Sequence, residues 1–155
     1  MRSKALVISG LLLLFCAVPS FGKDGGFETS RLVVASAGGR HVFTVELAVS
    51  AAQRSQGLQN RRRLASDAGM LFDFEAAQPI FFWMKNTYLP LDIMFIADDG
   101  RIINIARDTT PLSPAKITSS GPARAVLEVN AGTAKRLGIE AGDSVEHPIF
   151  TSQAK

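Results

Sequence analysis

A short polar segment, Lys85-Asn86-Thr87, stands between two strongly apolar runs and is the segment best suited to bind a ligand. The runs, at 80–84 and 91–96, have the composition of buried strands. Burial explains the runs, but it does not explain a lysine and an asparagine at their junction, next to Trp83. A cation beside an aromatic ring can bind anionic groups through charge-assisted hydrogen bonds and planar groups through stacking.

Trp83 has two interpretations, which depend on the faces of its strand. Side chains alternate between the two faces of a strand, so the side chain of Trp83 lies on the other face of the strand from that of Phe82. Because two adjacent large aromatic residues cannot both face one core, either both faces of the strand are covered or Trp83 lines a pocket. Lys85 lies on the side of Trp83 if the strand continues, whereas Asn86-Thr87 is typical of a turn.

Two carboxylates, Asp92 and Glu128, interrupt apolar strands. A charge in such a strand is unfavourable unless it is paired, hydrogen bonded or presented to a ligand. The two residues could form the acid–base pair of a hydrolase. Alternatively, Asp92 could pair with Lys85 or Arg61, or close the preceding turn with a hydrogen bond.

These polar residues are expected to converge, because charges inside apolar strands need partners. Lys85 and Asn86 should then lie near Asp92, with Glu128 on a neighbouring strand. We predict a non-enzymatic site for a small polar or anionic ligand or a peptide; the alternatives are a hydrolase and a purely structural buried network. The ligand-binding candidates are Arg61, Trp83, Lys85, Asn86, Asp92, Glu128 and Asn130.

Metal and cofactor chemistry is not indicated. His41 and His147 lie far apart in the chain, and the single cysteine, Cys16, lies in an apolar N-terminal run. A transition-metal site would have to be built from carboxylates, although such sites favour histidine and cysteine. The sequence also lacks a phosphate-binding glycine motif and a nucleophile elbow. We therefore expect no metal and no cofactor, and we assign no catalytic residue.

The first 22 residues have the pattern of a secretory signal peptide. Two basic residues precede an apolar run at 5–18, and Ser20 and Gly22 supply small residues for a cleavage site. The run is shorter than the roughly 20 residues that a membrane-spanning helix needs. We expect cleavage near Gly22, which would give a periplasmic or secreted protein without stable membrane insertion.

Removal of this segment lowers the net charge and removes Cys16, the single cysteine of the sequence. Loss of Arg2 and Lys4 leaves 15 of the 17 basic residues against 14 acidic ones, a net charge of +1 in place of +3. A nearly neutral domain gives no indication of nucleic acid or an anionic membrane surface as a partner. Because Phe15 is too large for the position before a lipoprotein cysteine, Cys16 is not expected to carry a lipid.

Short apolar segments separated by turn signals predict a single mostly β domain (α+β) over 31–150, after a flexible lead-in at 23–30. We expect an antiparallel jelly-roll-like sandwich or barrel with one or two short helices. Strands are predicted at 32–35, 41–49, 70–74, 80–84, 91–97, 101–106, 125–129 and 144–149, and helices at 51–58 and 131–137.

Local signals mark the starts of the helices and the turns. Ser50, with Gln53 three residues later, has the pattern of a capping box for the first helix, and Asn130 is expected to cap the second. Asp98-Asp99-Gly100 predicts a hairpin turn. The loop at 108–122 contains three of the seven prolines, and loops of this length in compact domains are often functional.

Six irregular motifs are spread along the chain from 54 to 143: RSQGLQNR at 54–61, GMLF at 69–72, FWMKNTYLPLDIMFI at 82–96, PLS at 111–113, VLEVNAG at 126–132 and LGIEAGD at 137–143. Together they resemble the DUF192 family, small bacterial and archaeal domains of unassigned biochemical function. The resemblance implies a mostly β, jelly-roll-like or barrel-like domain over roughly 41–148, and no catalytic residue. The chain departs from the family at Gln59-Asn60, where a methionine and a large residue are usual, so a pocket wall built from this loop would differ.

Overall fold

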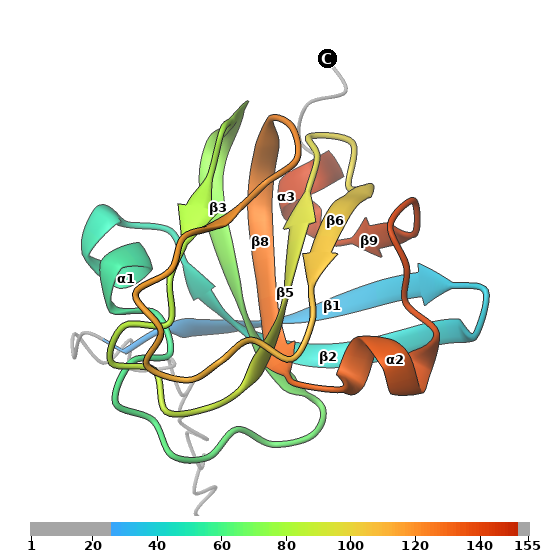
Figure 1. The fold of residues 1–155 in the computed structure, drawn as a ribbon. Coiled ribbons are helices and arrows are strands. Elements are labelled where there is room, and N and C mark those ends of the chain that lie inside the picture. The colour runs from blue at the N-terminus through green and yellow to red at the C-terminus, as the bar shows by residue number, and fades with distance from the viewer. Residues whose placement is uncertain (1–25, 152–155) are drawn as a thin grey trace, which may run out of the picture.

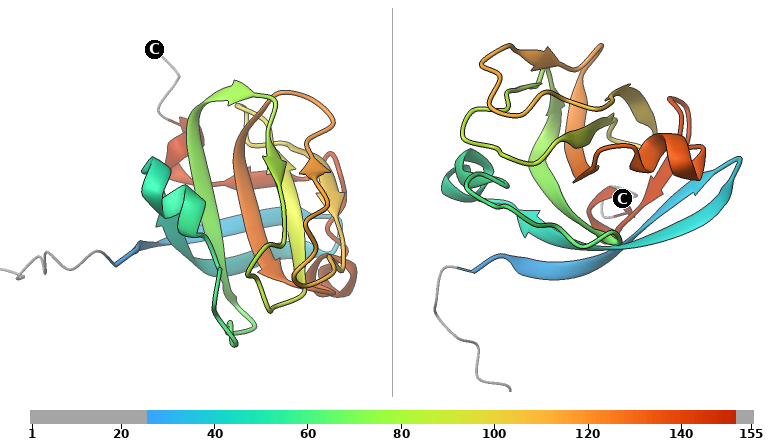
Figure 2. Two further views of the ribbon diagram at one scale, coloured as in Figure 1. Left: turned by 60° about the vertical axis from the view of Figure 1, so that its left-hand side comes forward. Right: turned by 60° about the horizontal axis from the view of Figure 1, so that its bottom comes forward.

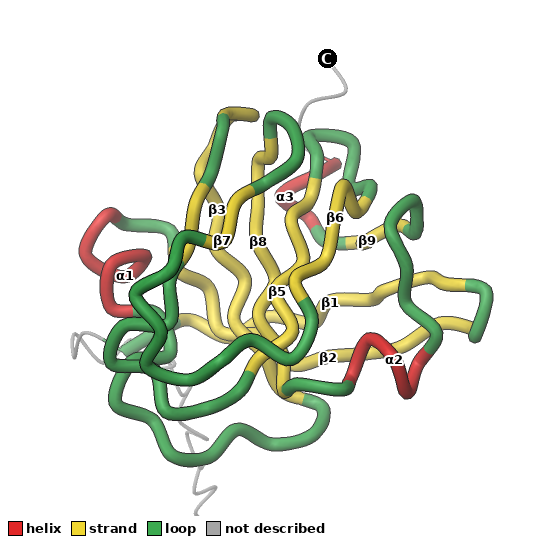
Figure 3. Tube along the Cα trace, viewed as in Figure 1, coloured by secondary structure: helices red, strands yellow, loops and turns green. Residues whose placement is uncertain are grey.

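Seven strands form one curled sheet in the computed structural model, which describes residues 26–151 (Figure 1). They are β1 (Glu28–Ser36), β2 (Gly39–Ala48), β3 (Ala68–Gln78), β5 (Leu91–Ile96), β6 (Ile102–Ala106), β8 (Ala123–Asn130) and β9 (Ser144–Glu146). Their order across the sheet is β6-β5-β8-β3-β2-β1-β9. A separate pair is formed by β4 (Phe81–Phe82) and β7 (Ile117–Thr118), and the helices are α1 (Ala51–Gln56), α2 (Thr133–Leu137) and α3 (Pro148–Thr151) (Figure 3).

The sheet curls into a half-barrel whose edge strands, β6 and β9, approach each other at one end (Figure 2). There the Val145 N–H donates to the Gly100 carbonyl at 2.7 Å, and the Ile102 N–H donates to the Asp143 carbonyl at 2.8 Å. The predicted mostly β class is confirmed, whereas the jelly-roll-like arrangement stays a prediction. The expectation of an antiparallel sheet was wrong for β2 and β3, which pair in parallel because α1 crosses between them.

The middle strands of the sheet, β3, β8 and β5, are covered on both faces, and all six residues of β5 are therefore buried. Leu71 and Leu127 pack on the inner face of the curl, in a core that also contains Ala134 of α2. Their chain neighbours Phe72 and Val126 pack on the outer face, in a second core that extends to residues of the β4–β7 pair. The outer core is the one that borders the candidate site.

Several element boundaries differ from the predictions. β1 begins at Glu28, which pairs with Leu47 of β2, so residues 28–30 are not part of a flexible lead-in. The chain forms α3 where the last strand was predicted to continue, because Pro148 has no N–H for a sheet ladder but suits the first turn of a helix. The hairpin turn at 98–100 is confirmed, and the proline-rich loop at 108–122 contains β7.

Two expectations concern the chain termini and membranes. The predicted signal peptide and Cys16 lie outside the described residues. Within 26–151, no helix is long and apolar enough to cross a membrane.

Candidate functional site

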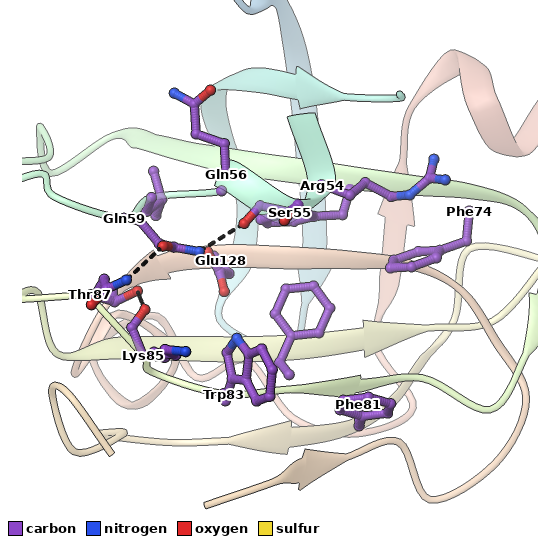
Figure 4. A pocket seen from close by; sticks show the side chains of 15 residues that line it. Arg54, Ser55, Gln56, Gln59, Phe74, Phe81, Trp83, Lys85, Thr87 and Glu128 are labelled. Atoms are coloured by element: carbon purple, nitrogen blue, oxygen red, sulfur yellow. Dashed lines mark hydrogen bonds between the residues drawn. The ribbon is translucent and has the colours of Figure 1, made fainter. Parts of the chain in front are cut away.

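A pocket of about 440 Å³ opens on the outer face of the sheet (Figure 4). One wall is α1 with the loop that follows it, and the other is β4 with the turn at 85–87. Side chains of β3 and β8 form the floor between them. The lining residues are Arg54, Ser55, Gln56, Gly57, Leu58, Gln59, Phe72, Phe74, Phe81, Phe82, Trp83, Lys85, Asn86, Thr87 and Glu128.

The first wall is held in place by the two ends of α1. The Ser50 hydroxyl accepts the Gln53 N–H and the Gln53 side chain accepts the Ser50 N–H, which confirms the predicted capping box. At the other end, the Arg54 guanidinium donates to the Asp73 carbonyl at 2.8 Å and lies 5.1 Å from the centroid of the Phe74 ring. Arg54 therefore ties the helix to β3.

Gly57 joins this wall to the floor of the pocket, and Gln59 joins it to the opposite wall. Gly57 has a φ of +48°, and a Cβ at this position would lie 3.3 Å from the Phe72 ring, so glycine lets the backbone approach the pocket closely. The Gln59 amide donates to the Ser55 carbonyl at 2.7 Å and accepts from the Asn86 amide at 3.3 Å (Figure 4). The residue at which the chain departs from the DUF192 pattern thus bridges the two walls.

The second wall is a tight turn after β4. Asn86 has a left-handed backbone, with a φ of +57°, which asparagine adopts more readily than most residues. The Asn86 carbonyl accepts the Asn60 N–H at 2.8 Å, and the Thr87 N–H donates to the Met84 carbonyl at 3.0 Å. The Met84 N–H donates to the Ser113 carbonyl at 3.0 Å, so the proline-rich loop braces the turn.

Aromatic rings enclose much of the space between the walls. Phe82 packs edge-on against Phe72, with 4.9 Å between the ring centroids. Trp83 is 46% exposed and lies at the mouth of the pocket rather than in a core. The Lys85 Nζ lies 5.8 Å from the centroid of the Trp83 ring.

Glu128 supplies the buried acid of the pocket. The residue is 5% exposed, and its carboxyl has no hydrogen-bond or ion-pair partner among the described residues. Burial raises the pKa of Glu128 from an ordinary value of 4.5 to about 8, because its low-polarity surroundings disfavour the charged form. In the free protein the carboxyl is therefore mostly neutral near pH 7. Arg54 and Lys85 are the other charged residues of the pocket lining.

Asp92 lies on the opposite face of the sheet from Glu128. In the β5–β8 pair, Ile93 is directly opposite Glu128, whereas Asp92 is opposite Val129. Cross-strand partners share a face and chain neighbours do not, so the two carboxylates point away from each other. The prediction that Asp92 converges with the other polar residues was wrong, and the alternative of an acid–base pair with Glu128 does not fit this geometry.

Asp92 instead holds two segments of backbone together. It is fully buried, and its carboxylate accepts the Asp108 N–H at 2.9 Å and the Ala134 N–H at 2.8 Å. The first bond fixes the start of the proline-rich loop, and the second fixes α2. The structural interpretation therefore applies to this residue, although its partners are backbone groups and not Lys85 or Arg61.

Two further candidates also lie outside the pocket. Arg61 forms two parallel bonds of 2.6 Å with the Glu46 carboxylate, which lies next to the loop at 60–67. The Asn130 amide donates to the Leu64 and Ala65 carbonyls, each at 3.0 Å, so it does not cap α2, whose N-terminal cap is a glycine. The pocket therefore collects four of the seven candidates: Trp83, Lys85, Asn86 and Glu128.

The sequence analysis missed the α1 wall and the aromatic floor. Arg54 and Gln59 read as polar residues of a short surface helix and loop, and Phe72 as an ordinary core residue. The packing of α1 and its following loop against the turn at 85–87 brings Arg54 and Gln59 into the pocket with Glu128, whereas Phe72 is there through the pairing of β3 with β8. The one signal that could have singled them out was the RSQGLQNR motif of the family resemblance.

The arrangement suits binding. Aromatic rings can stack on a planar or cationic group, Lys85 can pair with an anion, and Glu128 can exchange a hydrogen bond or a charge with a ligand. The described part of the chain has no cluster of three or more histidine, cysteine or acidic side chains that could hold a metal ion.

Comparisons with known proteins agree with this fold. The crystal structure of a proposed transcription regulator from Sinorhizobium meliloti 1021 is 50% identical in sequence, with a TM-score of 0.79, over 81% of this chain and 98% of that one. A protein of unknown function from Novosphingobium aromaticivorans DSM 12444 is 40% identical, with a TM-score of 0.78, over 85% of this chain and 94% of that one. No curated protein matches the chain. The family model of DUF192, described as "Uncharacterized ACR", matches residues 33–147, and the chain belongs to this family.

Proposed function

We propose that this protein is an exported, non-enzymatic binding module whose pocket takes a small polar or anionic ligand or the end of a peptide. The observation that carries the proposal is Glu128, a carboxyl that is 5% exposed, lines a pocket and has no partner among the described residues. Desolvation of a nearly buried carboxyl is unfavourable, and a ligand that bonds to it offsets part of that cost. Lys85, which forms no ion pair with any described residue, can bind an anionic group at the mouth.

Binding is favoured over hydrolysis by the positions of the two acids. A hydrolase of the kind considered from the sequence needs both carboxyl groups at one reacting bond. Asp92 and Glu128 lie on opposite faces of the sheet, so one ligand cannot reach both. A purely structural network accounts for Asp92, which has two backbone partners, but not for Glu128.

Intrinsic fluorescence can test the binding site, because Trp83 is the only tryptophan of the chain and lies at the mouth of the pocket. Titration with small carboxylates, phosphates, amino acids and monosaccharides should include at least one class that changes the Trp83 emission saturably. Lys85→Gln should weaken binding of an anionic member about tenfold, since a charge-assisted hydrogen bond is lost.

Lys135→Gln is the matched control for this titration, because Lys135 is exposed on α2 and does not line the pocket. It should leave the affinity unchanged. The absence of any saturable emission change, or an equal loss in the two lysine variants, would count against the proposed site.

Export is supported by the signal-peptide pattern of the first 22 residues. Expression of the full chain with its native N-terminus should give a mature protein in the periplasm or the medium that begins near Lys23. Edman sequencing or intact-mass measurement reads the first residue directly. A protein that retains Met1 in the cytoplasm would refute this part of the proposal.

A further inference from the structure

Glu128 and Lys85 occupy different depths of the pocket. Glu128 lies on the floor, in β8, whereas Lys85 is exposed on the turn at the mouth, beside Trp83 (Figure 4). The two side chains form no salt bridge with each other, and neither has an ion-pair partner in the part of the chain that the structure describes. The pocket thus presents an unpaired acid inside and an unpaired cation outside.

The pocket that contains this acid is also lined by aromatic rings. Phe82 packs edge-on against both Phe72 and Phe74, with centroid distances of 4.9 and 6.3 Å, and Trp83 lies beside the mouth. Ring faces attract cations within about 6 Å of the centroid. A carboxyl group in a pocket lined by rings suits an ammonium group, which can pair with the acid and contact a ring face. An anionic group at this depth would lie against Glu128 and gain nothing from the rings.

Arg54 does not supply a further cation for a ligand in the pocket. Although it lines the pocket, its guanidinium donates to the Val49 and Asp73 carbonyls and lies over the Phe74 ring. These contacts commit it to holding α1. The cation that remains for a ligand is Lys85.

On the basis of the proposed function, we infer that the ligand is a small zwitterion. Its ammonium group would bind Glu128 among the aromatic rings, and its anionic group would bind Lys85 at the mouth. Free amino acids and related amino-carboxylates have this chemistry.

Proton release follows from this mode of binding. The Glu128 carboxyl holds a proton in the free protein near pH 7, and this proton leaves to solvent when the ammonium group binds the carboxylate. Affinity should therefore rise by up to about tenfold per pH unit towards pH 8 and level off above it. A purely anionic ligand would show the opposite trend, because ionisation of Glu128 would repel it.

Isothermal titration calorimetry on the whole protein, between about pH 6 and about pH 8.5, tests the inference. The probes are two zwitterions. In phenylalanine the ammonium and carboxylate groups are close together, and in aminohexanoate they are far apart. Phenylpropanoate and hexanoate lack the ammonium group, and phenylethylamine and pentylamine lack the carboxylate. We expect at least one zwitterion to bind about tenfold or more tightly than both of its analogues, with an affinity that rises with pH.

Two variants test which residue binds the ammonium group of the probe and which binds its carboxylate. Glu128→Gln should weaken the zwitterion at least about tenfold and remove its pH dependence, while sparing the analogue without an ammonium group. Lys85→Gln should weaken the zwitterion and the carboxylate analogue but leave the amine unchanged. Lys135→Gln, outside the pocket, should change none of them.

The outcomes separate this inference from the proposed function. If the carboxylate analogues bind as tightly as the zwitterions, or if affinity falls as the pH rises through 8, the site is anionic and only the inference fails. The inference also fails if neither zwitterion binds while another probe changes the Trp83 emission. If no probe of any class binds, the proposed function fails as well.

Discussion

Replacement of Glu128 by glutamine should stabilise the domain at alkaline pH and leave it nearly unchanged in mild acid. The difference in the free energy of unfolding between the variant and the unmodified protein should grow by about 3–4 kcal/mol, in favour of the variant, as the pH rises from about 5 to about 8.5. The reason is that the folded state holds a proton on Glu128 up to about pH 8, whereas the unfolded chain loses it near 4.5. Chemical denaturation at several pH values measures the difference.

The sign follows from proton counting. Between 4.5 and 8 the folded state binds more protons at Glu128 than the unfolded state, so this residue makes stability fall as the pH rises through that window. His147 acts in the opposite direction at the acid end, because burial lowers its pKa and the folded state binds fewer protons there. Both proteins contain His147, so its effect cancels in the comparison. A stability difference that does not change with pH would show that Glu128 is not a buried acid.

Asp92→Asn should destabilise the domain by about 2–4 kcal/mol at all pH values near neutrality. The amide replaces one acceptor oxygen by an NH₂ group, which would then face the N–H of Asp108 or Ala134. A buried donor would be left without an acceptor at the junction of the proline-rich loop and α2. Urea denaturation near pH 7 gives the change directly.

Asp99→Asn is the matched control, because Asp99 also accepts a backbone N–H, from Arg101 at 3.0 Å, but its side chain is 64% exposed. Water can replace the lost acceptor there, so this variant should cost less than about 1 kcal/mol. The ligand affinity of any Asp92→Asn protein that still folds should be unchanged. A normal stability combined with lost binding would place Asp92 in the site after all.

The contrast between Asp92 and Glu128 shows which part of the site the sequence could predict. Their apolar neighbours predicted two buried acids, each within a strand, since burial and alternation are local properties. Which face each acid occupies depends on the register of β5 against β8, in which Ile93 and not Asp92 is opposite Glu128. A shift of one residue would have reversed the result, and no local pattern fixes that shift.

The walls of the pocket show the same limit at a larger scale. The capping box at Ser50 and the turn at Asn86 could be predicted, because each depends on residues within one turn of chain. The contact between them, through the Asn60 N–H and the Gln59 amide, joins segments about 26 residues apart in sequence. The sequence therefore predicted Trp83 and Lys85 as site residues but not Arg54 or Gln59.

The most direct measurement for the central claim is the titration of the Glu128 carboxyl by carbon NMR, assigned through the Glu128→Gln variant. In the free protein the carboxyl should titrate near pH 8, because it is buried in the pocket without a partner. Saturation with a bound zwitterion should lower this pKa, since the ammonium group stabilises the carboxylate. A Glu128 carboxyl that titrates near 4.5 in the free protein, or that is unaffected by a probe that binds, would contradict the account.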